Sequence, residues 1–141
     1  KFPNHPITRG VKPFKVVDEW YFNMRFRKDG VGKITPLLTA IPSDKVRNGP
    51  YVWPKGPYKH VQADKGRPET MMWAYERKDG GRGFGFTGGH KHVNWGNDNY
   101  RKAVLNGLLW IAKAKVPKNG IKSSVSTEEL KQNLDPKGKR K

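Results

Sequence analysis

The sequence predicts an α/β domain, and three features of residues 80–113 support that prediction. A short apolar stretch, GFGFT, has the aromatic composition of a buried strand. A glycine-rich turn with two histidines follows it, and apolar residues then recur at the spacing of an amphipathic helix. Because open α/β sheets keep their ligand sites at the carboxyl ends of strands, we expect a site at this turn.

The composition predicts one loop-rich domain. The chain has 141 residues, of which 34% are apolar, with 16 Gly and 11 Pro. Five Trp, five Tyr and six Phe predict a modest core rich in aromatic rings. There is no Cys, which excludes disulfides, thiolate metal sites and a cysteine nucleophile. The absence of Cys fits either compartment, so the localisation stays open.

The formal net charge of +17 has two interpretations. A basic surface can bind nucleic acid or another polyanion, or it can simply keep the chain hydrated and balance acidic segments elsewhere. The basic residues do not gather on one predicted helix face, and no DNA-reading motif is present. We therefore expect a small-molecule ligand and keep nucleic acid as the alternative.

The two ends of the sequence carry further expectations. No apolar run is long enough to span a bilayer, and the opening KFPNHPITRG is not a secretory signal. The chain begins with Lys1 rather than Met, which suggests processing or a fragment. We expect a domain over residues 1–116, followed over 117–141 by a basic, partly flexible tail with a short helix.

Clusters of β-branched and aromatic residues predict strands at 13–26, 34–41, 71–77 and 83–87. Pro36 makes the second an edge or irregular strand, because proline cannot donate to a ladder. The turn between Arg77 and Gly81 favours an antiparallel hairpin of the last two strands. Five prolines and three glycines predict a long loop at 42–68.

The sequence predicts a helix that begins at Asn97 or Asp98, either of which can cap it. Pro117 prevents its continuation, and a capping box of Ser126 and Glu129 predicts a second, short helix to about Asn133. The apolar residues that recur at helical spacing predict the buried face of the first helix: Val104, Leu105, Leu108, Leu109 and Ala112.

The turn is the first candidate site. Gly88 and Gly89 would let a ligand approach the backbone closely. His90 and His92 would face the same side of an extended segment, which suits metal ligation or proton transfer near neutral pH. The alternative is that one imidazole only fastens the loop to backbone. Two histidines without a third ligand leave a metal open, and the turn lacks the motifs of phosphate-binding loops.

The acidic pair Asp18–Glu19 is the second candidate. On a strand the two side chains would point to opposite faces, so at most one would reach a given site. Arg25 or Arg77 could be structural partners. Equally, burial could raise a carboxyl pKa toward neutrality and make a general acid or base.

Other candidates come from the remaining imidazoles and rings. His5 would be a third imidazole at the turn if the first segment folds back, whereas His60 is expected at the surface. Trp95, in a Gly- and Asn-rich turn, is the best exposed platform for a sugar ring. Tyr51 and Trp53 offer further faces, Tyr21 is expected to contact the ligand, and Trp73 and Trp110 are expected in the core.

Three ordered motifs then suggest a family: HPITRG with DEWYF, GRGFGFTGGH, and YRK-x-VLNGLLWIAK. Together they resemble the carboxyl-terminal part of ThuA-like (trehalose-utilisation) domains over roughly residues 4–115. The resemblance implies part of a flavodoxin-like, class I glutamine-amidotransferase-like three-layer fold whose amino-terminal half would be a missing partner segment. It also implies exposed sheet edge and a carbohydrate-related role. The amidotransferase cysteine is absent, so glutaminase chemistry is not implied.

The resemblance and the residues together predict a sugar site. In it His90 acts as acid, base or ligand, Glu19 or Asp18 is its charge partner, and His5 is the third member. The expected substrate contacts are Gly88, Gly89, His92, Trp95 and Tyr21. A polyanion-binding module and a non-catalytic scaffold are the alternatives, and the sequence names no cofactor, reaction or oligomeric state.

Overall fold

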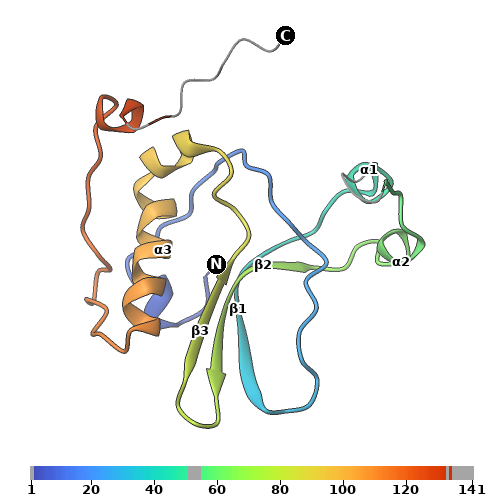
Figure 1. Ribbon diagram of the computed structural model, residues 1–141, viewed down its shortest axis with the longest axis horizontal. Coiled ribbons are helices and arrows are strands. Elements are labelled where there is room, and N and C mark those ends of the chain that lie inside the picture. Colours follow the sequence, from blue (N-terminus) through green and yellow to red (C-terminus); the bar gives the residue numbers. More distant parts are fainter. Residues whose placement is uncertain (1, 51–54, 133, 135–141) are drawn as a thin grey trace.

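The protein is described by a computed structural model that covers residues 2–50, 55–132 and 134 (Figure 1). Tyr51, Trp53, Asn133 and the basic end at 135–141, which the sequence interpretation used, lie outside these residues. In chain order the elements are η1 (Pro6–Thr8), β1 (Gly32–Ala40), α1 (Asp44–Arg47), α2 (Lys59–Gln62), β2 (Glu69–Arg77), β3 (Arg82–Phe86), η2 (His92–Gly96), α3 (Asp98–Ile111) and η3 (Glu129–Lys131).

A three-stranded antiparallel sheet of order β1-β2-β3 lies at the centre of this small α/β structure. The hairpin β2–β3 pairs Met72 with Phe86 and Glu76 with Arg82, which confirms the predicted connection. β1 is an edge strand, and its register shifts between Pro36 and Leu38 and again between Leu38 and Thr39. The sequence prediction of an irregular edge at Pro36 is therefore confirmed.

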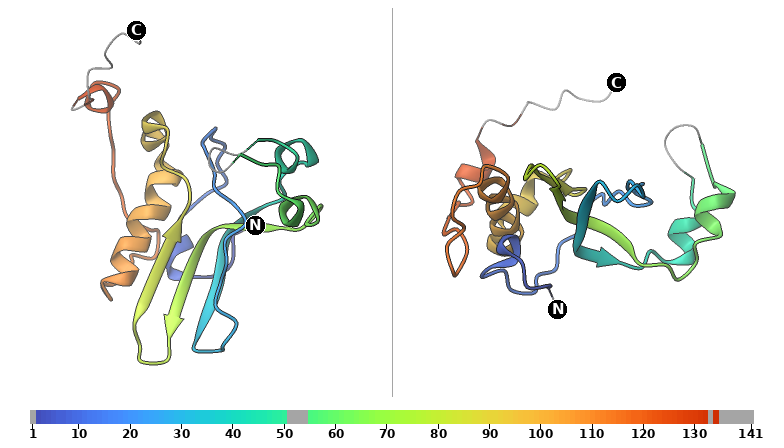
Figure 2. Two further views of the ribbon diagram at one scale, coloured as in Figure 1. Left: turned by 45° about the vertical axis from the view of Figure 1, so that its right-hand side comes forward. Right: turned by 90° about the horizontal axis from the view of Figure 1, so that it is seen from below.

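The strand predicted at 13–26 is wrong, because that segment has no regular secondary structure. Its aromatic residues anchor it to rings on both faces of the sheet instead. The Trp20 ring lies 5.5 Å from that of Phe86 on the face that α3 covers. The Phe26 ring lies 5.1 Å from that of Trp73 on the opposite face, across which the segment runs (Figure 2). The aromatic residues that suggested a strand therefore pack against the sheet, and the segment does not pair with a neighbouring strand.

α3 begins as predicted but buries a different face. The Asn97 side chain accepts from the backbone N–H groups of Asn99 and Tyr100 at 3.0 and 3.1 Å. The predicted apolar face is correct at Leu109, which packs against the core, but wrong at Leu108 and Ala112: Leu108 is 50% exposed and Ala112 is exposed too. The residues buried on α3 are Tyr100, Arg101, Ala103, Asn106, Gly107 and Trp110.

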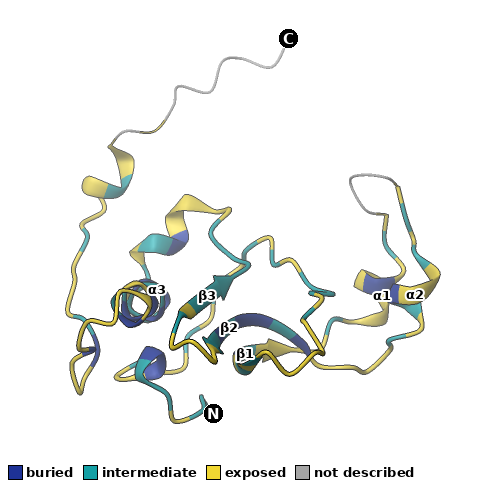
Figure 3. Ribbon diagram, turned by 60° about the horizontal axis from the view of Figure 1, so that its bottom comes forward, coloured by how far each residue is buried: buried dark blue, intermediate teal, exposed yellow. Residues whose placement is uncertain are grey.

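The reason lies in the rings that β3 presents to the helix. A Cβ on Gly107 would lie 2.8 Å from the Phe84 ring, so only a residue without a side chain fits there. The core is built from Ile7, Leu37, Met72, Ala74, Ala103, Trp110 and Val116 (Figure 3). Trp110 is thus in the core as predicted, whereas Trp73 is only partly buried and lies on the other face.

Two segments lie at the periphery of the sheet, one between β1 and β2 and one after α3. The predicted loop at 42–68 contains two short helices, α1 and α2. Arg47, the last residue of α1, is buried, and its guanidinium lies 3.0 Å from the carboxylate of Glu69, the first residue of β2. After α3 the chain runs back along the helix to η3 (Figure 1). Ser126 and Glu129 form the predicted capping box, with bonds of 2.7 and 3.1 Å, although the short helix it opens is 3-10 rather than α.

Candidate functional site

The carboxylate of Asp18 holds the turn that follows β3. One of its oxygens accepts hydrogen bonds from the backbone N–H of Gly89 at 2.9 Å and from the Tyr100 hydroxyl at 2.5 Å. The other accepts from the backbone N–H of Lys91 at 3.0 Å. One carboxylate therefore joins the segment before β1, the turn and the first turn of α3.

This arrangement keeps Asp18 ionised. Partial burial alone would raise the pKa of its carboxyl, but the hydrogen bonds from Tyr100, Gly89 and Lys91 outweigh burial and hold that pKa well below its usual range. Burial and the bond to Asp18 raise the pKa of the Tyr100 hydroxyl. The geometry therefore favours a positioning role for Asp18 over proton transfer. Tyr100, which the sequence interpretation missed, gave no signal beyond its place in the first turn of the helix.

Glu19 reaches the same turn. Its Oε2 lies 3.1 Å from Nδ1 of His90, and the two side chains are 46% and 62% exposed. The expectation that only one of the adjacent acids could face the turn is wrong, because it assumed strand geometry for a segment that is not a strand. Arg77 is not their partner, since it pairs with Asp79 at 3.1 Å. In the described part of the chain no ion pair joins Arg25 to either acid.

The two glycines serve the fold of the turn. A Cβ on Gly88 would lie 2.8 Å from the Tyr100 hydroxyl and 2.9 Å from the Trp20 ring, so protein atoms fill the space expected for a ligand. Gly89 has a φ of 102°, which L side chains rarely adopt, and its N–H is bonded to Asp18. Both glycines explain how the turn packs against α3.

Of the other residues predicted to contact a ligand at the turn, one has a structural role and two offer aromatic rings. Nε2 of His92 lies 3.0 Å from the backbone oxygen of Leu130, so this imidazole fastens η3 to the turn, as the alternative interpretation held. Trp95 is half-buried, with its ring 5.3 Å from that of Tyr100. Tyr21 is 59% exposed, and of these rings it is the most open to a ligand.

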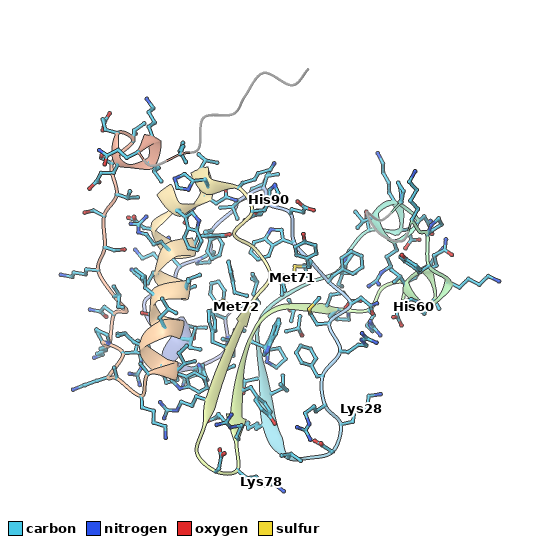
Figure 4. All side chains as sticks on the ribbon, in the orientation of Figure 1. Lys28, His60, Met71, Met72, Lys78 and His90 are labelled. Carbon is cyan, nitrogen blue, oxygen red and sulfur yellow. The ribbon has the colours of Figure 1, made fainter. Side chains whose placement is uncertain are left out.

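His5 does not join this group. It caps η1, with its Nδ1 accepting from the N–H of Ile7 at 3.2 Å and its ring 5.0 Å from that of Trp110. That ring belongs to the last turn of α3, whereas the His90 turn lies by the first (Figures 1 and 4). Burial lowers the pKa of His5. The expected meeting of His5 with the turn is therefore wrong: the first segment folds back to the other end of the helix.

Among the described residues the turn carries no metal cluster, and the two cavities beside the sheet are lined by other residues. Within residues 2–50, 55–132 and 134, no three His, Asp or Glu side chains are grouped as a metal site would need. A cavity of about 440 Å³ lies between Phe14 and Leu37, and one of about 340 Å³ lies beside Trp73. The His90–Glu19 pair instead stands on an open surface, where it can act only on a ligand that binds from solvent.

Fold and site together define a small α/β domain with a histidine–carboxylate pair on a turn at the end of a strand. A family model described as "ThuA: Trehalose utilisation" matches residues 1–111, which is most of the chain and ends with the last residue of α3. The chain belongs to the ThuA family. No curated protein and no solved structure matched it. Among the described residues, no helix combines the length and apolar character needed to cross a membrane.

Proposed function

We propose that this chain handles trehalose or a related sugar derivative at the His90 turn, with His90 as the base toward a sugar hydroxyl. The observation that carries the proposal is the 3.1 Å contact between Nδ1 of His90 and Oε2 of Glu19 on the turn that Asp18 holds. Membership of a family described by trehalose utilisation supports the substrate class.

The pair has the arrangement that a general base requires. A neutral imidazole that donates its Nδ1 proton to a carboxylate keeps its lone pair on Nε2. Because the His90 side chain is 62% exposed, a hydroxyl can reach that nitrogen. Glu19 would orient the ring and stabilise the cation that forms when His90 takes a proton.

Tyr21 and Trp95 are the proposed binding surfaces. Tyr21 follows Glu19 by two residues, is exposed, and offers a ring with a polar hydroxyl. The Trp95 ring lies 3.6 Å from the position that a Cβ on Gly89 would take, so it flanks the turn. Gly88, Gly89 and His92 would then act on the ligand only through the shape of the turn.

The finer fold assignment is also a proposal. We infer that β1, β2, β3 and α3 form part of a flavodoxin-like, three-layer arrangement to which a further segment of the same domain would contribute. Family membership supports this inference. Circular dichroism of the chain with and without such a segment would test it, with a cooperative gain in stability as the expected result.

Titration of the whole chain with trehalose and with glucose, followed by NMR of the histidine ring protons, tests the function. We expect the His90 signals to shift on addition of one of these sugars. The shift should disappear in Glu19→Gln, and His90→Gln should abolish the accompanying change at Tyr21. His60→Gln is the matched control, since His60 is an exposed imidazole on α2. Unchanged His90 signals at saturating sugar, or equal effects of His60→Gln, would refute the assignment.

A second candidate function, polyanion binding, is favoured by the net charge of +17. Lys28 and Lys78 stand on the two turns at the end of the sheet remote from His90 (Figure 4). If this surface binds polyanions, retention on heparin should fall steeply between about 50 and about 200 mM salt. Replacing both lysines with glutamine should weaken the retention, whereas a response that is flat with salt excludes the electrostatic mechanism.

A further inference from the structure

We propose that residues 121–131, here called the strap, position the Trp95 ring for contact with the sugar. The strap runs back along α3 after that helix ends and finishes in η3 (Figure 1). The inference rests on the proposed function, which it deepens by assigning positioning residues to the same site. Because the family model matches residues 1–111, the strap lies outside the matched part of the chain.

Two buried side chains of α3 fix the first part of the strap. Oδ1 of Asn106 accepts from the backbone N–H of Ile121 at 2.9 Å. The Arg101 guanidinium donates from Nε to the Ser123 hydroxyl and from Nη2 to the Ser123 backbone oxygen, both at 2.8 Å. Since Asn106 and Arg101 are buried, these bonds are partly shielded from water. The strap therefore follows a fixed path along α3.

Arg101 also joins the strap to η2, the element that carries Trp95. Its Nη1 donates to the backbone oxygen of Trp95 at 2.6 Å, and its Nη2 is paired with the Asp98 carboxylate. The five donors of a guanidinium lie in one plane, so their partners are fixed relative to one another. One side chain thus connects the strap, η2 and the first turn of α3.

A single residue of the strap, Leu130, contacts both ends of η2. Its backbone oxygen lies 3.0 Å from Nε2 of His92, the first residue of η2. Its Cδ1 lies 2.9 Å from the position that a Cβ on Gly96, the last residue of η2, would take. The leucine side chain therefore packs directly on the backbone at Gly96. Trp95 lies between these two contacts, so Leu130 spans the element that positions the ring.

The Trp95 ring is held on its inner side by the turn and by α3. Its centroid lies 5.3 Å from that of the Tyr100 ring, in an edge-on arrangement, and its nearest carbon lies 3.6 Å from the Cβ position of Gly89. The residue is only half-buried, so part of the ring remains open to solvent. An indole placed in this way offers an apolar face to the C–H groups of a sugar and an N–H to a hydroxyl.

The strap does not hold the proposed base. The Asp18 carboxylate accepts from the backbone N–H groups of Gly89 and Lys91, one on each side of His90. In the ranges that the structure describes, no hydrogen bond or ion pair joins the strap to His90 or to Glu19. Weakening the strap should therefore lower the affinity for the sugar and leave the His90–Glu19 pair in place.

Leu130→Ala in the whole chain, studied by NMR, tests the proposal. Before sugar is added, we expect the indole N–H signal of Trp95 and the amide signal of Gly89 to move, because the Trp95 ring lies beside that glycine. In titrations with trehalose and with glucose, the concentration that half-saturates the His90 shift should rise about fivefold. The size of that shift at saturation should be unchanged.

Two further substitutions separate positioning from a general loss of packing. Leu134→Ala is the matched control, because it removes the same side chain from a position that is 51% exposed, and it should change none of these signals. His92→Phe, which cannot donate to the Leu130 oxygen, should weaken sugar binding as Leu130→Ala does. His92→Gln keeps a donor and should restore most of the affinity.

The outcomes distinguish this proposal from the proposed function. Unmoved Trp95 and Gly89 signals in Leu130→Ala overturn the positioning role, whether or not sugar binds. Moved signals with unchanged sugar affinity overturn it too, because the ring would then not contact the ligand. Equal effects of Leu134→Ala would also contradict it. If the natural protein responds to neither sugar, the proposed function fails, and the sugar-free signals alone decide whether the strap positions Trp95.

Discussion

The two ends of α3 are both held by a polar clamp, but they use their histidines in opposite ways. At the first turn of the helix, the Asp18 carboxylate accepts three hydrogen bonds from the turn and from Tyr100. At the middle and last turns, the buried Asn106 donates to Ile7 and Arg9 and accepts from Ile121, while His5 packs on Trp110.

The comparison shows that surroundings, not residue type, decide whether an imidazole is free to react. His5 has its Nδ1 occupied by a backbone N–H and its ring against an indole. His90 has its Nδ1 beside a carboxylate and its ring in solvent. The first therefore supports the fold, and the second remains available for chemistry. The following predictions test this division.

The largest expected effect is at the buried clamp. Asn106→Leu leaves the carbonyls of Ile7 and Arg9 and the N–H of Ile121 without their partner, so the free energy of unfolding should fall by about 3 kcal/mol. Urea denaturation followed by tryptophan fluorescence measures the loss. Asn4→Leu, at an exposed position, is the control. A loss below about 1 kcal/mol would show that the clamp contributes little.

Asp18→Asn removes the charge from the other clamp while keeping its shape. Hydrogen bonds to a charged acceptor contribute more than neutral ones, so we expect a loss of about 2 kcal/mol in the same assay. Glu19→Gln should cost less than about 1 kcal/mol, because its pair with His90 is exposed. If the two substitutions destabilise equally, Asp18 has no special role in holding the turn.

The same clamp predicts acid sensitivity. The pKa of Asp18 is lower in the folded state than its ordinary value of 3.8, so its contribution is present above that pH and is lost as the pH falls further. Unfolding free energies measured between about pH 5 and about pH 2.5 should therefore decline more in the natural protein than in Asp18→Asn. Parallel curves for the two proteins would contradict the assignment.

At the other end, His5→Ala removes a cap and a ring contact and should cost about 1 kcal/mol. Because burial lowers the pKa of His5, protonation favours the unfolded state. The stability it contributes is present above pH 6.5 and is lost as the pH falls below that value. Thermal melts at about pH 7.5 and about pH 5 should therefore converge for the two proteins at the lower pH. If His5→Ala changed the response to sugar, His5 would not be a purely structural residue, and the proposed contrast with His90 would be wrong.

The smallest structural effect is expected for His90→Gln. The side chain is largely exposed, so the unfolding free energy should change by less than about 0.5 kcal/mol. The sugar-dependent NMR shift, by contrast, should be lost. A large loss of stability with this substitution would place His90 with His5 among the residues that serve the fold.

The sequence was most informative where structure is local. The Asn97 cap, the hairpin at residues 77–81, the capping box of Ser126 and Glu129 and the irregular edge at Pro36 all depend on contacts within a few residues. The family assignment also followed from ordered local motifs. Each of these features has a short-range cause, such as an unpaired N–H or a residue that cannot donate.

The errors share the opposite cause. Residues 13–26 have the composition of a strand, but their rings found partners on both faces of the sheet rather than a neighbouring strand. The prediction for the buried face of α3 is wrong at Leu108, because the Phe84 ring leaves room on the neighbouring position of the helix only for Gly107. In both cases the packing of side chains distant in sequence decided which local structure formed or which face was buried.

The sequence by itself therefore determined that a strand, a histidine turn and a capped helix follow one another, because those signals arise between near neighbours. Only the tertiary structure decided that Glu19 meets His90, that Asp18 holds the turn, and that His5 lies at the far end of α3. Those pairings join residues about 70 to 105 positions apart, and no local preference encodes such a contact.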